Sequence, residues 1–223
     1  MHPGNYANQH PDRAAFVMAS TGESVSYKEF EARANQLAHL LRAQGLKRLD
    51  HYSIFMENNN RYLECCAAGE RAGLYYTCIN HYLKGEELAY ILENSESQVL
   101  IVSKEKLAVA QEALSLGSGV ALCLVIGADD SELPASSPDG LSIASYESAT
   151  QSLPTTPISD ESLGTSMLYS SGTTGRPKGI LRPLPDNPPE ECLPLYDFLT
   201  GLWHYREDMI YLSPAPLYHS APQ

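Results

Sequence analysis

Short apolar runs alternate with helical patterns between residues 52 and 126, and this alternation limits the possible folds more than any other feature of the chain. Four runs predict strands, at residues 52–56, 75–79, 98–102 and 120–126. Three stretches between them predict helices, at residues 61–72, 86–93 and 105–116. Strands that are apolar on both faces and alternate with helices are typical of a mostly parallel sheet covered on both sides. We therefore expect an α/β fold, with mostly parallel sheets flanked by helices.

One helix has clear boundaries before this region begins. Ser26 and Glu29 form an S-x-x-E pattern, in which side chains and backbone cap the first turn of a helix reciprocally. Apolar residues then recur at helical spacing through Phe30, Leu37 and Leu41, and Gly45 ends the pattern. A helix is therefore expected between Ser26 and Gly45.

A polar, proline-bearing stretch at residues 152–160 suggests a boundary between two parts of the chain. Residues 1–157 are expected to form an N-terminal α/β subdomain, and residues 158–223 to begin a second α/β subdomain. In this second part we predict a strand at 163–169, an irregular proline-rich stretch at 183–189, a helix at 192–205 and a strand at 209–212.

Composition excludes several classes of protein. The chain of 223 residues carries a formal net charge of −12, which argues against a nucleic-acid partner, because phosphate backbones need clustered Lys and Arg. No apolar run reaches the roughly 18 residues of a membrane span. The five cysteines form no C-x-x-C pair or zinc spacing, and no signal peptide is visible. A cytoplasmic protein with reduced thiols is expected, with Cys65 and Cys66 as buried packing residues.

Residues 169–179 carry the strongest chemical signal, Tyr-Ser-Ser-Gly-Thr-Thr-Gly-Arg-Pro-Lys-Gly. Glycines allow tight turns that bring backbone N–H groups close to an anion, while hydroxyl groups and one lysine add donors and a positive charge. These are the groups that bind a polyphosphate. The candidate phosphate-binding residues are Ser170, Ser171, Gly172, Thr173, Thr174, Gly175 and Lys178.

Other readings of this segment fit less well. A Walker A loop requires Gly directly before its Lys, and Pro177 occupies that position here. The segment is also not a G-x-G-x-x-G dinucleotide turn. A flexible Ser/Gly linker would explain neither the strand predicted before the segment nor the Pro177-Lys178-Gly179 sequence that ends it.

The segment resembles the signature phosphate loop of the acyl-adenylate-forming (AMP-binding) superfamily, which contains acyl- and aryl-CoA synthetases, peptide-synthetase adenylation domains and beetle luciferases. Three further stretches resemble motifs of this superfamily in the same order, at residues 24–30, 71–80 and 213–222. Thr77 and Cys78 depart from the Val-Pro that the second motif often has. Together the four features cover almost the whole chain.

The resemblance implies that a carboxylate attacks the α-phosphate of Mg²⁺-ATP, that pyrophosphate leaves, and that the acyl group then passes to coenzyme A. Ser170 to Gly175 would wrap the β- and γ-phosphates, and Lys178 would stiffen the loop or offset its charge. His219 would orient the reacting carboxylate, although a lone histidine can also be structural. Tyr218 would line the acid pocket or belong to the core. Arg182 fits a surface arginine better than a phosphate ligand.

The resemblance also implies that the magnesium carboxylate, the ribose-binding Asp and the catalytic lysine lie beyond Gln223. We therefore expect an N-terminal portion of an acyl-CoA synthetase that is inactive alone, with no metal site of its own and with homodimer formation as an open possibility. The expected substrate is a hydrophobic medium- or long-chain, or bulky polycyclic, carboxylic acid. An amino-acid adenylation domain and a non-catalytic nucleotide- or lipid-binding module remain alternatives.

Overall fold

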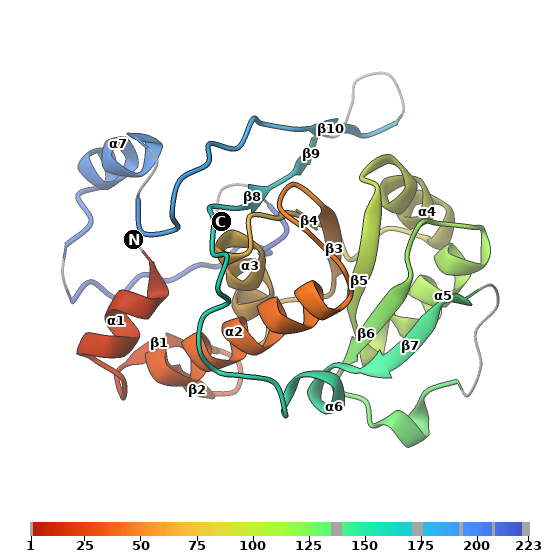
Figure 1. Cartoon of the computed structure of the whole chain (residues 1–223), viewed down its shortest axis with the longest axis horizontal. Coiled ribbons are helices and arrows are strands. Elements are labelled where there is room, and N and C mark those ends of the chain that lie inside the picture. The colour runs from red at the N-terminus through yellow and green to blue at the C-terminus, as the bar shows by residue number, and fades with distance from the viewer. Residues whose placement is uncertain (1, 135–139, 171–175, 192–193, 207, 220–223) are drawn as a thin grey trace.

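A six-stranded parallel sheet forms the centre of the protein (Figure 1). The computed structural model describes residues 2–134, 140–170, 176–191, 194–206 and 208–219. The strand order is β7-β6-β5-β3-β4-β8, and every neighbouring pair is parallel. The strands are β3 (His51–Phe55), β4 (Tyr75–Cys78), β5 (Ser97–Ser103), β6 (Leu122–Ile126), β7 (Ser142–Ser145) and β8 (Thr165–Ser166). The expected α/β fold with a mostly parallel sheet is confirmed.

Helices cover both faces of this sheet (Figure 1). One face carries α2 (Tyr27–Ala43), α3 (Tyr62–Arg71) and α6 (Tyr146–Thr150), and the other carries α4 (Gly85–Asn94) and α5 (Leu107–Ser115). Successive strand residues divide between the two cores: Val99 and Ile101 pack on the first face, whereas Leu100 and Val102 pack on the second. This explains the continuous apolar runs, because each strand is buried on both sides.

The capping signals at the ends of α2 act as the sequence predicts. The Ser26 hydroxyl accepts a hydrogen bond from the backbone N–H of Glu29 at 3.2 Å. At the other end Gly45 has a φ of 90°, a left-handed conformation that glycine adopts without steric cost. Local sequence therefore fixes both ends of this helix.

A buried ionic network joins α2 to α3. Arg71, which is 1% exposed, donates to both carboxylate oxygens of Glu31 at 2.7 Å, and it also donates to Asn35 Oδ1. Glu161 lies 3.7 Å from the same guanidinium. The bidentate pair compensates the burial of both charges and fixes how the two helices pack.

The N-terminal elements have no counterpart in the sequence-based prediction. They are α1 (Pro3–Gln9) and a hairpin of β1 (Ala14–Val17) and β2 (Ser24–Ser26). The ring of Tyr6 on α1 stacks on Tyr27 of α2 with centroids 5.2 Å apart. This region therefore packs beside α2, outside the parallel sheet.

The second part of the chain differs from its prediction in three places. The strand predicted at 163–169 is divided into β8 and β9 (Leu168–Ser170), which belong to different sheets. The helix predicted at 192–205 is present but shorter, as α7 (Pro194–Trp203). The strand predicted at 209–212 is wrong, because those residues have no strand partner among the described segments and Ile210 is 97% exposed. Strand β8, which follows the predicted boundary, belongs to the same six-stranded sheet as the strands before it. A second subdomain starting at residue 158 therefore stays a prediction.

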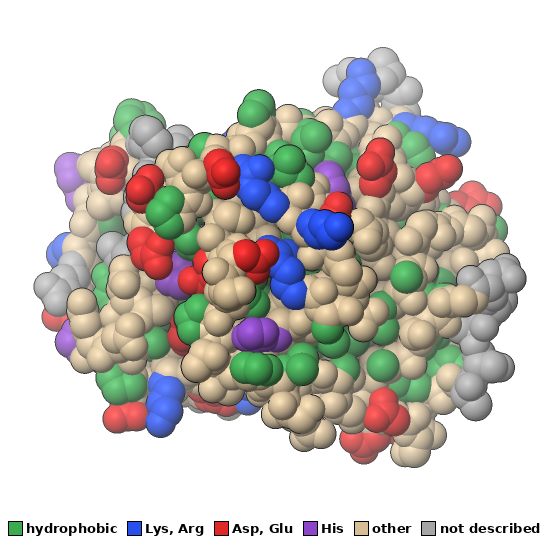
Figure 2. All heavy atoms as spheres, viewed as in Figure 1, with side chains coloured by type: hydrophobic (Ala, Val, Ile, Leu, Met, Phe, Trp, Pro, Cys, Tyr) green, Lys and Arg blue, Asp and Glu red, His purple; other side chains and the backbone are tan. Residues whose placement is uncertain are grey.

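Side chains on the surface are mixed in charge. Figure 2 shows acidic and basic groups interspersed over the face it displays. Cys65, Cys66, Cys78 and Cys123 are buried free thiols, which confirms the packing role expected for the first two, whereas Cys192 lies outside the described residues. Within the described segments, no helix combines the length and the apolar character that crossing a bilayer requires.

Candidate functional site

The predicted phosphate-binding segment begins and ends in two antiparallel strands that form a hairpin. Directly after β8, the backbone N–H of Met167 donates to the carbonyl of Tyr76 in β4. Strand β9 then leaves this sheet and pairs with β10 (Lys178–Ile180). The register sets Ser170 directly opposite Lys178. Both side chains are exposed. Ser171, Gly172, Thr173, Thr174 and Gly175 lie outside the described residues.

Helix α4 supports this hairpin through side chains that the sequence analysis did not identify. The Tyr90 hydroxyl donates to the carbonyl of Pro177 at 3.1 Å, and the guanidinium of Arg176 lies 4.9 Å from the centre of the Tyr90 ring. One turn further along α4, Asn94 Oδ1 accepts a hydrogen bond from Tyr169 at 2.7 Å. The i, i+4 spacing of Tyr90 and Asn94, which places both on one helix face, was the only signal in the sequence.

The protonation state of Tyr169 suits this contact. Burial raises the pKa of Tyr169 to about 12, so its hydroxyl stays protonated and remains a donor at neutral pH. Across the hairpin, a methyl group on Gly179 would overlap Met167 and lie 3.1 Å from Tyr169 Cζ. The glycine that ends the motif thus allows the side chains of Met167 and Tyr169 to pack closely over β10.

The second group of predicted residues lies at the carboxyl end of the parallel sheet. Tyr218 is half-buried and packs with Leu217 on the core that contains α2 and α3, whereas His219 is exposed. The Tyr218 and His219 rings have centroids 4.3 Å apart. On the other side of Tyr218 the ring of His81, which follows β4, meets it edge-on at 5.4 Å. Tyr218 therefore contacts both a histidine of its own segment and one from the sheet.

Burial lowers the pKa of His81, and the positive charge of Lys106 lowers this pKa further, against the opposing influence of Glu57. A lowered pKa favours the neutral imidazole beside the half-buried Tyr218 ring. The sequence offered no motif for His81, which we expected to be a surface or packing residue, and its ring contacts fit the packing role.

The structure does not join the two groups of predicted residues. No hydrogen bond or ion pair within the described parts of the chain connects Tyr218 or His219 to Ser170 or Lys178. Arg182 lies two residues after β10 and is exposed, as expected for a surface arginine. It forms no ion pair with a described residue. The convergence of the phosphate loop and His219 on one ligand stays a prediction.

No metal site is present in the described residues, since no three His, Cys, Asp or Glu side chains there lie close enough to hold an ion.

Sequence comparison shows what the chain is similar to. It is 33% identical over 176 residues to a 3-oxocholest-4-en-26-oate–CoA ligase from Rhodococcus rhodochrous, covering 77% of this chain and 30% of that protein. It is 29% identical over 177 residues to a medium-chain-fatty-acid–CoA ligase from Ectopseudomonas oleovorans, covering 78% and 32% respectively. The chain thus spans about a third of the length of these relatives.

A solved structure shares the fold. A protein from Rhodopseudomonas palustris that is assigned as a long-chain-fatty-acid CoA ligase matches with a TM-score of 0.76 at 22% identity, over 97% of this chain and 51% of that one. The family model described as "AMP-binding enzyme" matches residues 5–223, a range that includes both the hairpin and the segment around His219. The chain is therefore a member of the AMP-binding enzyme family.

Proposed function

We propose that this chain supplies the phosphate-binding loop and part of the acid pocket of an ATP-dependent acyl-CoA synthetase. The observation that carries the proposal is the β9–β10 hairpin, which pairs Ser170 with Lys178 at the two ends of the hydroxyl- and glycine-rich segment. Opposed residues of an antiparallel pair lie only about 5 Å apart at Cα. The two ends of the hydroxyl- and glycine-rich segment are therefore neighbours, so its donor groups belong to one site.

In the proposed reaction, a carboxylate oxygen attacks the α-phosphorus of ATP and pyrophosphate leaves, giving an acyl-adenylate. The thiol of coenzyme A then displaces AMP. The hydroxyl and N–H groups of residues 170–175 donate to the β- and γ-phosphates, and the Lys178 ammonium offsets the charge on the departing pyrophosphate. These groups contribute by positioning and charge stabilisation, not by covalent chemistry.

His219 and Tyr218 are proposed to serve the acid. The exposed His219 imidazole can donate a hydrogen bond to the carboxylate, while the Tyr218 ring forms part of the pocket wall. We propose a hydrophobic acid as substrate, which is supported by relatives named for a steroid acid and for medium-chain fatty acids. Because the chain covers about a third of these relatives, we further propose that residues 1–223 do not complete the reaction alone.

Nucleotide binding to the 223-residue chain tests the role of the hairpin. In isothermal titration, ATP should bind more tightly than AMP, since only ATP carries the β- and γ-phosphates. Lys178→Ala should weaken ATP binding about ten-fold and leave AMP unchanged, because a charge-assisted hydrogen bond is lost. Lys47→Ala removes another exposed lysine, in the turn before β3, and should change neither affinity.

Other outcomes would overturn the proposal. Equal affinity for ATP and AMP would show that the segment does not bind the terminal phosphates. Absent ATP binding together with tight binding of fatty acyl chains would indicate a non-catalytic lipid-binding module. Amino-acid-dependent ATP–pyrophosphate exchange in an enzyme carrying this chain would indicate an adenylation domain of the peptide-synthetase type.

A further inference from the structure

A side-chain amide at the carboxyl end of the parallel sheet contacts the segment that carries Tyr218 and His219. Asn58 follows β3, and its Nδ2 donates to the carbonyl of Ala215 at 3.2 Å. Its Oδ1 accepts from the backbone N–H of Leu217 at 2.8 Å. One amide thus binds the carbonyl of one residue and the N–H of the residue two positions later.

This pattern is the one that a parallel strand uses. A residue in a parallel ladder bonds through its N–H and its C=O to two residues that are two positions apart on the neighbouring strand. The Asn58 carboxamide has the same donor and acceptor as a peptide group, so it substitutes for a strand residue. The contact therefore sets both the position and the direction of the segment, as strand pairing would.

The sequence of the segment limits which of its backbone groups can make this contact. Pro214 and Pro216 have no backbone N–H, so in an extended segment only the edge that carries residues 213, 215 and 217 has its N–H donors. The carbonyl of Ala215 and the N–H of Leu217 belong to this edge. Asn58 pairs with these two groups.

The loop that holds Asn58 is itself braced by polar contacts. Asn59 Oδ1 accepts from the backbone N–H of Arg61 at 2.9 Å, and Glu57 Oε2 accepts from the Ser103 hydroxyl at 2.8 Å. Ser103 is the last residue of β5, which neighbours β3. The position of Asn58 is thus linked to the carboxyl ends of two adjacent strands.

These two strands, β3 and β5, flank the point at which the order of strands along the sheet reverses. After β3 the chain crosses to β4 on one side, and then returns past β3 to β5 on the other. The connecting helices α3 and α4 lie on opposite faces of the sheet. In open α/β sheets, ligands bind in the crevice outside the carboxyl ends of the strands at such a switch point. Asn58 therefore brings the segment to the part of the sheet where a ligand is expected.

Directly after the contact, the segment turns. The backbone N–H of His219 donates to the carbonyl of Pro216 at 3.1 Å, which closes a turn over residues 216–219. This turn places Tyr218 against His81 and brings the His219 ring beside Tyr218. Fixing Ala215 and Leu217 therefore fixes the two side chains proposed to serve the acid.

We propose that Asn58 is a positioning residue, which sets residues 213–219 so that Tyr218 and His219 face the carboxylic acid. The inference depends on the proposed function for the identity of the ligand, but not for the contact itself. Asn58 acts through the segment and has no contact with the reacting groups. Its loss should weaken acid binding without changing ATP binding, since Lys178 and Ser170 belong to a separate hairpin.

Hydrogen exchange on the 223-residue chain tests the contact. Asn58→Ala should accelerate exchange of the Leu217 amide about five-fold or more, since a hydrogen bond worth about 1 kcal/mol is lost. Asn58→Asp keeps an acceptor for Leu217 but loses the donor to Ala215, so it should give an intermediate rate. Asn60→Ala removes a neighbouring amide that donates to the Glu23 carboxylate, and it should leave exchange of the Leu217 amide unchanged. Unchanged exchange at Leu217 in Asn58→Ala would overturn the contact.

Decanoate serves as the probe for the acid-positioning role. Addition of decanoate should shift the imidazole NMR signal of His219, and Asn58→Ala should raise the apparent Kd from this titration about five-fold. The Kd for ATP should stay unchanged in the same variant, which a general loss of folding would not allow. A His219 signal that does not respond to decanoate, or an equal Kd in both proteins, would overturn the positioning role. Failure of the proposed function would instead appear as equal binding of ATP and AMP.

Discussion

The parallel sheet and the C-terminal region of this chain use apolar residues in opposite ways. Between residues 51 and 126, strand residues pack on both faces and the large apolar side chains are almost all buried. Between residues 176 and 219, large apolar side chains are exposed: Ile180, Leu181, Phe198, Leu202, Trp203, Tyr205, Ile210, Tyr211 and Leu212. Apolar composition alone therefore does not make a core, which forms only where strand pairing brings segments together. We expect stability to reside in the sheet region, while the candidate binding groups belong to the less buried part.

The largest effect on stability is expected at Arg71. Arg71→Ala leaves the carboxylate of Glu31 without its bidentate partner in a site that is largely closed to water. Breaking a buried pair by removing one partner costs about 3–5 kcal/mol. Urea unfolding followed by circular dichroism should show a loss of this size.

A double variant separates the unpaired charge from lost packing. In Arg71→Met/Glu31→Leu neither charge remains, so most of the stability should return, because apolar replacement of a whole buried pair is often close to neutral. A loss below about 1 kcal/mol for Arg71→Ala would contradict the view that the sheet region depends on this network.

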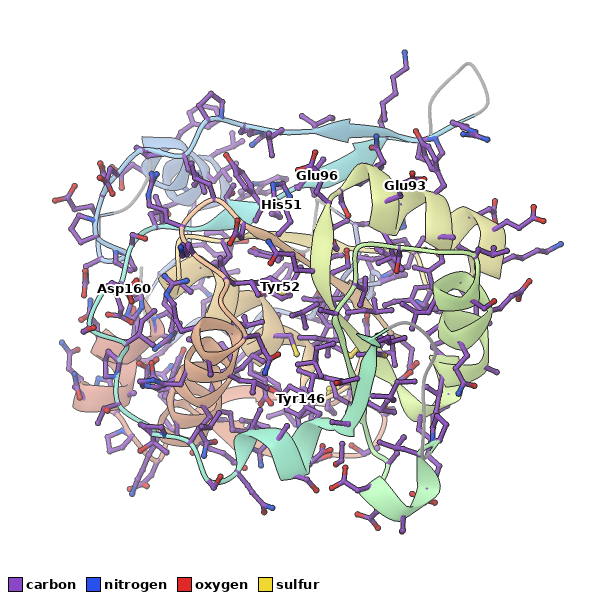
Figure 3. The ribbon with its side chains drawn as sticks, turned by 45° about the vertical axis from the view of Figure 1, so that its right-hand side comes forward. His51, Tyr52, Glu93, Glu96, Tyr146 and Asp160 are labelled. Carbon is purple, nitrogen blue, oxygen red and sulfur yellow. The ribbon has the colours of Figure 1, made fainter. Side chains whose placement is uncertain are left out.

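A smaller, pH-dependent effect is expected at Glu64, which lies on α3 in the same region. Burial raises its pKa to about 8, against the opposing influence of Arg61 and of a 2.9 Å hydrogen bond from Tyr146. Figure 3 shows Tyr146 turned from α6 toward the interior. Unfolded glutamate titrates near 4.5, so between 4.5 and 8 the native state binds more protons and stability falls as the pH rises.

Replacing the carboxyl group should remove this dependence. Between pH 5 and pH 8 the original chain should lose about 3–4 kcal/mol more than Glu64→Gln, which cannot ionise and can still accept from Tyr146. Exposed Glu105 provides the matched control, because Glu105→Gln should keep the slope of the original chain. Parallel stability curves for Glu64→Gln and the original chain would exclude Glu64 as the cause.

The contrast between the two regions also explains how far the sequence could predict the fold. Strands β3 to β6 were predicted because each is a short, mainly apolar segment, and such segments suit a sheet that is buried on both faces. Strand β7 was missed, since Ser142–Ser145 has two serines and lies at the sheet edge. Residues 209–212 have the same apolar pattern as a buried strand, but they pair with no strand in the parts of the chain that the structure describes. A local pattern shows what a segment could pack, while the presence of a partner depends on tertiary structure.

The candidate site shows the same division. The phosphate-binding segment and the Tyr218-His219 pair could be proposed from the sequence because each hypothesis depends on consecutive residues, and both stay predictions. The side chains that support them could not: Tyr90 contacts Pro177 across 87 positions, and Asn58 contacts Leu217 across 159. A polar residue in a loop carries no local sign of the distant backbone group that it will bind.

The smallest effect on stability is expected in α7, where the comparison between the two regions is sharpest. Phe198 is 64% exposed, so Phe198→Ser removes almost no buried surface and should change the free energy of unfolding by less than about 0.5 kcal/mol. Leu88→Ala in α4, at a side chain that is fully buried, should cost about 2–5 kcal/mol in the same urea titration. The single tryptophan, Trp203, is 63% exposed, and its fluorescence in the folded chain should be quenched readily by iodide or acrylamide. A Phe198→Ser loss comparable to that of Leu88→Ala, or a protected Trp203, would show that the C-terminal region forms a core of its own.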